Sequence, residues 1–300
     1  MFKRFLSYYK PQMGLFVADT VCALVLAAID LAFPIILRNL TGGLFTQGQA
    51  AIMQALGMIA VGLVLMYAVR CACRYFVSYW GHVMGARMES KMREDLFDQY
   101  ERFSFAYFDR NSSGDMMSRV VNDLFDICEA AHHVPEWIII CGIEIIGSFV
   151  ILFTIAPVLA LAMAVVTAAF AVIMFWQNMR MREVFSDNRK KISGINAQLQ
   201  DSLAGMRVVK SFANEETERF KFRVSNNRYL SSKENMYHAM GVYTATYGLL
   251  SGVLYVIVVL LGGWLVAQDQ LQAVDMATFA LYISLFCTPL ETLVNSAEMY

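Results

Sequence analysis

Residues 156–176 read APVLALAMAVVTAAFAVIMFW, a stretch without a single charged side chain. At about 1.5 Å of rise per helical residue, it covers the roughly 30 Å hydrocarbon core of a bilayer. It is longer than a barrel strand, and lipid tolerates no unpaired backbone group, so the stretch is predicted to be a helix. Five further apolar stretches resemble it, namely residues 13–37, 51–69, 137–153, 240–267 and 276–297. The sequence therefore predicts an all-α membrane protein with six transmembrane helices.

The basic residues lie almost entirely on one side of this predicted membrane. Of the 24 Lys and Arg residues, only Arg38 falls in a link that the alternation of spans places outside. An excess of Lys and Arg marks the cytoplasmic side, so we expect a multi-pass protein of the plasma or inner membrane with a cytoplasmic N-terminus. The charged fraction of 16% is below the quarter typical of soluble domains. The basic links carry nearly as many acids, so nucleic-acid binding is not expected.

Two long links, residues 70–136 and 177–239, are predicted to be cytoplasmic helical hairpins. In the first, Met84, Met88 and Met92 recur at helical spacing, so the second span is expected to continue as a helix beyond the membrane. Turn-forming residues follow, and Ser112 is predicted to cap the returning helix. Asn214, before two glutamates, is the corresponding cap in the second hairpin.

The predicted hairpin tips carry apolar side chains. Phe105, Tyr107 and Phe108 flank the first turn, and Val209 and Phe212 flank the second. Apolar residues at a solvent-facing tip are expected to be covered. Two interpretations remain open: a cytoplasmic partner domain receives both tips, or the aromatic side chains pack between hairpins of the same bundle.

The first residues form a separate small element. Phe5 and Tyr9 share one face at helical spacing, with cations elsewhere, and Pro11 follows. This pattern predicts an interfacial elbow helix over residues 1–12, with its rings among the lipid headgroups. Residues 13–300 then form one transmembrane domain.

Two segments resemble the cytoplasmic loops of ATP-binding cassette (ABC) exporters of the multidrug and lipid-flippase type. These are residues 105–126, FAYFDRNSSGDMMSRVVNDLFD, and residues 205–220, GMRVVKSFANEETERF. The resemblance implies a half transporter that pairs with an identical or different second half. It also implies that residues 105–110 and 208–216 are coupling helices seated in a nucleotide-binding domain. The residues expected at that joint are Phe105, Tyr107, Phe108, Asp109, Val209, Phe212 and Glu215.

The resemblance also implies a domain that this sequence does not contain. No G-x-x-x-x-G-K-[ST] phosphate loop occurs in the chain. We therefore expect no cofactor in this chain, whose status as an enzyme stays open, and we expect ATP and Mg²⁺ in a separate nucleotide-binding domain. That domain is predicted either on a longer protein, of which this chain is a fragment, or on another subunit.

Ionisable residues within the spans are the candidates for a substrate cavity, because burying them in lipid is costly. Glu144, Asp30 and Glu291 are expected to face it, unless each has a buried partner. Arg119 and Asp123, four residues apart, are predicted to pair with each other or to brace the neighbouring hairpin. His132 and His133 resemble no metal site, and none is expected.

These features favour the membrane half of an ABC exporter that moves an amphipathic or lipid-like small molecule by ATP-driven alternating access. Two other classes remain: a secondary transporter that needs no ATPase, and a membrane scaffold that transports nothing. The spans are mostly continuous, whereas secondary transporters usually have broken ones. The sequence does not identify the cargo.

Overall fold

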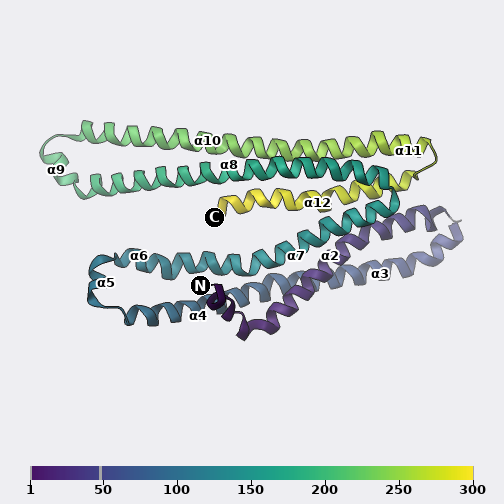
Figure 1. Cartoon of the computed structure of the whole chain (residues 1–300), viewed down its shortest axis with the longest axis horizontal. Coiled ribbons are helices and arrows are strands. Elements are labelled where there is room, and N and C mark those ends of the chain that lie inside the picture. Colours follow the sequence, from purple (N-terminus) through teal and green to yellow (C-terminus); the bar gives the residue numbers. More distant parts are fainter. Residues whose placement is uncertain (1, 47–48, 300) are drawn as a thin grey trace. The chain divides into compact units, whose positions relative to one another are not determined.

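The chain is described by a computed structural model that gives the backbone of residues 2–46 and 49–299 and the side chains of residues 4–45 and 49–288. Within these ranges every regular element is a helix, as predicted. Packing divides the chain into two compact units, Met1–Ile151 and Leu152–Tyr300. Each unit contains one long helical hairpin (Figure 1).

The described residues of the first unit form α1 (Phe2–Ser7), α2 (Met13–Gly42), α3 (Gln49–Phe76), α4 (His82–Glu101), α5 (Phe105–Arg110), α6 (Ser113–Ser118) and most of α7 (Leu124–Ile155). Four short turns join them: the 3₁₀ turns η1 (Lys10–Gln12) and η2 (Leu44–Thr46), and the π-helical turns η3 (Val77–Gly81) and η4 (Arg119–Asp123). Because η3 links α3 to α4 without a break, the second apolar stretch continues into a long polar helix. This confirms the predicted extension.

The core of the first unit lies where α4 meets α7 and the N-terminal segment. Met84 and Met88, two of the methionines that recur at helical spacing, are buried there with Tyr9, Cys128 and Ala131. Phe5 packs against this cluster, and its ring lies 5.8 Å from that of Tyr9. Phe5 and Tyr9 thus contact protein side chains, and the interfacial elbow at the lipid headgroups stays a prediction.

The hydroxyl of Tyr9 has a specific acceptor in this core. Pro135 lies inside α7 and has no N–H, so the carbonyl of Ala131, four residues earlier, lacks its helical donor. The Tyr9 hydroxyl donates to that carbonyl at 2.7 Å. The N-terminal segment is therefore attached to α7 at the point where the proline interrupts the helix.

The second unit is built on one antiparallel helix pair. Its elements are α8 (Pro157–Ala204), α9 (Met206–Ser211), α10 (Glu215–Ile257), the π turn η5 (Val258–Gly262), α11 (Gly263–Ala267) and α12 (Ala273–Met299). In Figure 1, α8 and α10 run side by side with α9 at their turn, and α12 contacts both. Tyr243, Phe279 and Tyr282 are fully buried between these helices.

Polar side chains join α8 to α10 along their length. Gln177 donates to Thr246 at 2.9 Å, and Asn188 donates to Ser232 at 3.3 Å. Closer to the turn, Ser225 donates to Gln198, and Ser202 donates to Glu218 at 2.7 Å. These hydrogen bonds join the two helices along their polar halves as well as their apolar ones.

Five helical stretches are long and apolar enough to cross a membrane; they lie within Arg4–Gly42, Gln49–Glu101, Ser113–Ile155, Pro157–Ala204 and Glu215–Ala267. A sixth apolar helix, Ala273–Thr288, is shorter over the residues that could be searched. The chain is accordingly a multi-pass membrane protein. The sixth span stays a prediction.

Candidate functional site

The tip of the first hairpin is the short helix α5, which occupies residues 105–110, the range expected for the first coupling helix. Ser112 caps the next helix by accepting from the Gly114 N–H at 3.2 Å, which confirms the predicted cap. Asn111, between the two helices, donates its side-chain amide to the Tyr107 carbonyl at 2.8 Å. The turn is thus closed by local hydrogen bonds that leave its apolar side chains free.

The aromatic residues of this tip are of two kinds. Phe105 is 89% exposed and Phe108 is 41% exposed. Tyr107 is partly buried, and its ring lies 4.2 Å from that of Phe103. Phe105 and Phe108 are therefore available to a partner, whereas Tyr107 supports the turn. Asp109, the fourth residue expected at this tip, is exposed.

The tip of the second hairpin is α9, which begins two residues before and ends five residues before the expected range 208–216. α9 ends at Ser211, and two residues later Ala213 adopts a left-handed conformation with φ of 51°. Asn214 is the N-cap residue of α10, as predicted, and its side chain accepts from the Thr217 hydroxyl at 2.6 Å. Glu215, which was expected in the coupling helix, begins α10 instead, because the left-handed residue separates the two helices.

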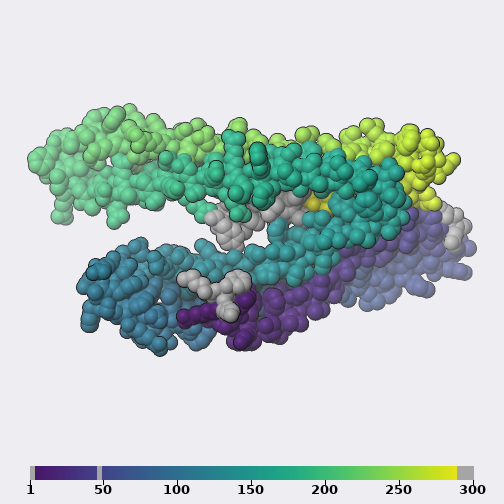
Figure 2. Space-filling model, viewed as in Figure 1, coloured from purple at the N-terminus to yellow at the C-terminus, as the bar shows by residue number. Residues whose placement is uncertain are grey.

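Apolar side chains also project from this second tip. Phe212 is 79% exposed and Val208 is 61% exposed, while Val209 is partly buried. Val209 and Phe212 line an open cavity of about 900 Å³ between the end of α8 and the start of α10. Lys210 and Glu215 lie 3.9 Å apart across the turn. The tip therefore combines an apolar surface with charged neighbours. Figure 2 shows each tip at the outer end of its own unit, α5 in blue and α9 in green.

The first hairpin is braced internally by residues that the sequence did not indicate, and bracing of the neighbouring hairpin by Arg119 and Asp123 stays a prediction. Arg119 and Asp123 are exposed, and neither has an ion pair in the described part of the chain. Instead Arg93 on α4 donates to the carbonyl of Val120 at 3.2 Å, and Tyr100 donates to the carbonyl of Met116 at 3.4 Å. A π-helical turn disturbs the regular backbone ladder, and Val120 lies within it. Arg93 satisfies this carbonyl from the opposite helix.

Asp30, one of the candidates for the cavity, has a partner. Arg70 on α3 donates to both of its carboxylate oxygens, with contacts of 3.0 and 3.2 Å, which joins α2 to α3. Glu144 on α7 is 8% exposed and lies within electrostatic range of this pair. The charge of Asp30 is thus compensated by Arg70, whereas no hydrogen bond or ion pair compensates Glu144 in the described part of the chain. The side chain of Glu291 lies outside the described residues.

A comparison with known protein families identifies the kind of chain that carries these hairpins. The family model of the ABC transporter transmembrane region matches residues 16–290. The chain belongs to this family. The resemblance drawn from the two loop segments is thereby confirmed.

Three proteins similar to this ABC transporter transmembrane chain come from Bacillus subtilis and Shewanella oneidensis. An uncharacterized ABC transporter ATP-binding protein, YwjA of Bacillus subtilis, is 31% identical over 300 residues, which are 100% of this chain and 52% of the relative. YknU of the same organism, which has the same description, is 24% identical over 299 residues, which are 100% of this chain and 51% of YknU. An ATP-dependent lipid A-core flippase of Shewanella oneidensis is 26% identical over 243 residues, and the match covers 76% of this chain and 40% of the flippase. The chain thus spans about half the length, or less, of these curated relatives.

Proposed function

We propose that this chain is the membrane half of a dimeric ABC exporter that moves a lipid-like amphiphile, driven by ATP in a nucleotide-binding domain. In this proposal α5 and α9 are the coupling helices. The observation that carries it is the pair of exposed apolar tips, Phe105 at 89% and Phe212 at 79% exposure, in a chain of this family. The proposed orientation has the N-terminus and both tips in the cytoplasm, with α12 completing six spans.

The hairpins are suited to transmit a movement made at their tips. Each arm is a long helix bound to its neighbour by interhelical hydrogen bonds, such as Arg93 to Val120 in the first and Asn188 to Ser232 in the second. Coupling between distant sites requires packed elements that move as a body. A domain that grips α5 and α9 would therefore displace the membrane ends of the arms with the tips.

Burial of the tip aromatic side chains would supply much of the docking energy. A Phe side chain taken from water into an apolar groove gains about 1.5–3 kcal/mol. Phe105 and Phe212 together would thus contribute about 3–6 kcal/mol, before the cost of association is subtracted.

The proposed cargo follows from Glu144 and from the relatives. Glu144 is a buried acid among apolar residues of α7, and such residues in membrane helices commonly mark substrate pathways. Some relatives are named as lipid A-core flippases. A lipid-like amphiphile fits the names of these relatives. Glu144 would in addition attract a cationic group on its head, and the surrounding apolar side chains would contact its chains.

The test uses the complete transporter, with nucleotide-binding domains and both halves, reconstituted in liposomes. ATP-dependent movement of a fluorescent cationic lipid and its stimulation of ATP hydrolysis are both measured. We expect Phe105→Asp and Phe212→Asp each to reduce both activities at least tenfold, because a buried charge replaces an apolar anchor. The matched control is Phe97→Asp, because Phe97 lies on α4 away from the tip and is 58% exposed. We expect both activities of this variant to stay within twofold of the parent. Full activity of both tip variants, or transport without ATP, would exclude the proposal.

A further inference from the structure

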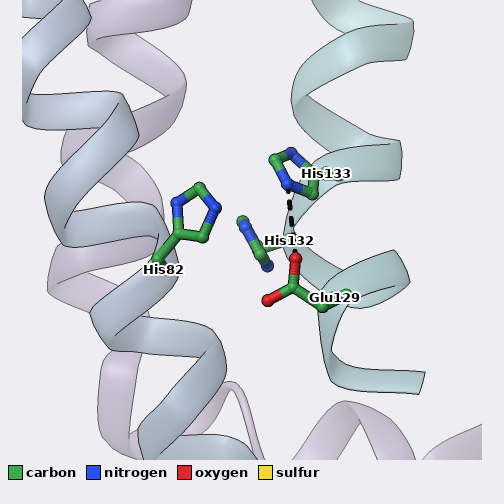
Figure 3. A group of neighbouring side chains, drawn as sticks. All are labelled: His82, Glu129, His132 and His133. Carbon is green, nitrogen blue, oxygen red and sulfur yellow. Dashed lines mark ion pairs between the residues drawn. The ribbon is translucent and has the colours of Figure 1, made fainter. Parts of the chain in front are cut away.

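Four potential metal ligands from two helices meet in the first unit. His82 begins α4, and Glu129, His132 and His133 lie on α7. One ligand atom from each residue lies within 4.8 Å of all the others. Figure 3 shows the three imidazole rings close together, with Glu129 beside His133. We propose that this cluster binds one divalent transition-metal ion, with Zn²⁺ as the best fit.

The hydrogen bonds of two histidines prepare them as ligands. The Nδ1 atom of His132 lies 3.2 Å from the Cys128 carbonyl, and that of His82 lies 2.6 Å from the Ser78 carbonyl. A carbonyl accepts only from an N–H, so we assign the proton to Nδ1 in both rings. Each Nε2 then presents a lone pair. Zinc-binding histidines are typically oriented in this way, by a backbone carbonyl that holds the other ring nitrogen.

His132 supplies the observation that points most directly to a missing ligand. Its side chain is 2% exposed, yet its Nε2 atom has no hydrogen-bond partner in the described part of the chain. A buried acceptor without a partner is costly and needs an explanation. The unpartnered atom belongs to the ring that contacts both other histidines, with centroid distances of 4.6 Å to His82 and 4.0 Å to His133. A metal ion in the cluster would satisfy it.

The charge and geometry of the surroundings favour a dication. Nε2 of His133 lies 3.5 Å from the Glu129 carboxylate, which brings one formal negative charge to the cluster. Asp19 on α2 lies next to this cluster, because its Oδ1 is 3.4 Å from the position that a Cβ on Gly81 would take. This oxygen also lacks a hydrogen-bond partner in the described structure. Zinc–nitrogen bonds of 2.0–2.1 Å place tetrahedral ligands about 3.3 Å apart. Small rotamer changes would bring the present spacing to that value.

The backbone around the cluster allows the two helices to approach closely. Gly81 and Gly85 lie four residues apart on the face toward α7, a spacing of small residues that permits close helix contact in membranes. A Cβ on Gly85 would lie 3.0 Å from Nδ1 of His132. The π-helical turn η3 ends directly before His82, and such turns are frequent at functional sites. A bound ion would join the start of α4 to α7 at the base of the first hairpin.

The test measures Zn²⁺ binding to the full chain, purified in detergent through a tag without histidine and stripped with a chelator. We expect one Zn²⁺ per chain by elemental analysis, and competition with a chromophoric chelator to give a dissociation constant in the micromolar range or below. Co²⁺ in place of Zn²⁺ should give the visible absorption of a four-coordinate nitrogen–oxygen site. Saturating Zn²⁺ should raise the unfolding temperature by about 5 °C.

Two single variants separate a built site from adventitious binding. His82 is exposed, so His82→Ala should fold and should weaken Zn²⁺ binding at least tenfold and abolish the thermal shift. The matched control is His238→Ala, an exposed histidine of α10 outside the cluster, which should bind within twofold of the parent. Absence of stoichiometric Zn²⁺ on the parent chain, or equal binding by the two variants, would overturn the proposal.

Discussion

Replacing Tyr9 by Phe removes one hydroxyl and leaves a buried carbonyl without a donor. The ring would keep its contacts with Phe5 and Phe16, whose centroids lie 5.8 and 5.4 Å away, so apolar packing should be preserved. The lost interaction is the 2.7 Å hydrogen bond to the Ala131 carbonyl. Because Pro135 cannot replace this donor, the full penalty of an unsatisfied buried acceptor applies, about 1–3 kcal/mol. We expect Tyr9→Phe to reduce the free energy of unfolding by about 2 kcal/mol.

A second substitution tests the physical reason. Pro135→Ala restores a backbone N–H four residues after Ala131, so the carbonyl regains its helical donor. In that background Tyr9→Phe should cost less than about 0.5 kcal/mol, which gives a coupling energy of about 1.5 kcal/mol between the two positions. The assay is reversible unfolding in mixed detergent micelles, followed by helical ellipticity.

The control for this cycle is Tyr255→Phe, which removes the hydroxyl of an exposed tyrosine and should leave stability unchanged. The reasoning is refuted if Tyr9→Phe costs the same whether residue 135 is Pro or Ala. It is also refuted if the substitution costs nothing in the parent chain.

Two other predictions concern the packing of the first unit. Gly85→Ala places a Cβ 3.0 Å from His132 and should lower the free energy of unfolding by about 1–3 kcal/mol, whereas Gly142→Ala, with nothing within 4 Å, should be neutral or stabilising in the same micelle assay. Asp30→Ala and Arg70→Ala should each destabilise the chain, and the double variant should cost less than their sum by about 1–2 kcal/mol. Strict additivity of the last pair would show that their bidentate contact contributes nothing.

Features set by local sequence were predictable. The apolar stretches gave the long helices, because a bilayer requires them to be helical and sets their length. Met84 and Met88 were correctly placed on one helix by their spacing, and their burial became visible only in the structure. Ser112 caps the helix expected of it, and Asn214 occupies the expected N-cap position without a side-chain capping bond, since both depend on residues within one turn.

Features that join distant parts of the chain were not predictable from spacing. The partner of Asp30 is forty residues away, and the donor for the Ala131 carbonyl is Tyr9, which is 122 residues away. His132 and His133 formed no recognisable motif by themselves, because His82 lies on another helix. The Glu129-x-x-His132 spacing, which is found in metal-binding helix bundles, was the one local signal available.

The same limit applies to the tips. The apolar residues of α5 and α9 were identified, but the sequence did not separate exposed Phe105 from Tyr107, which rests on Phe103. It also extended the second tip too far, because nothing in the composition shows that Ala213 adopts a left-handed conformation.

The most direct test of the central claim is amide hydrogen exchange at α5 and α9 in the complete transporter, compared with the chain lacking its nucleotide-binding domain. If the two tips dock into that domain, exchange at both short helices should slow at least tenfold in the complete assembly, while the turn at Gln268 and Asp269 exchanges at an unchanged rate. Equal exchange at α5 and α9 with and without the domain would contradict docking at these tips.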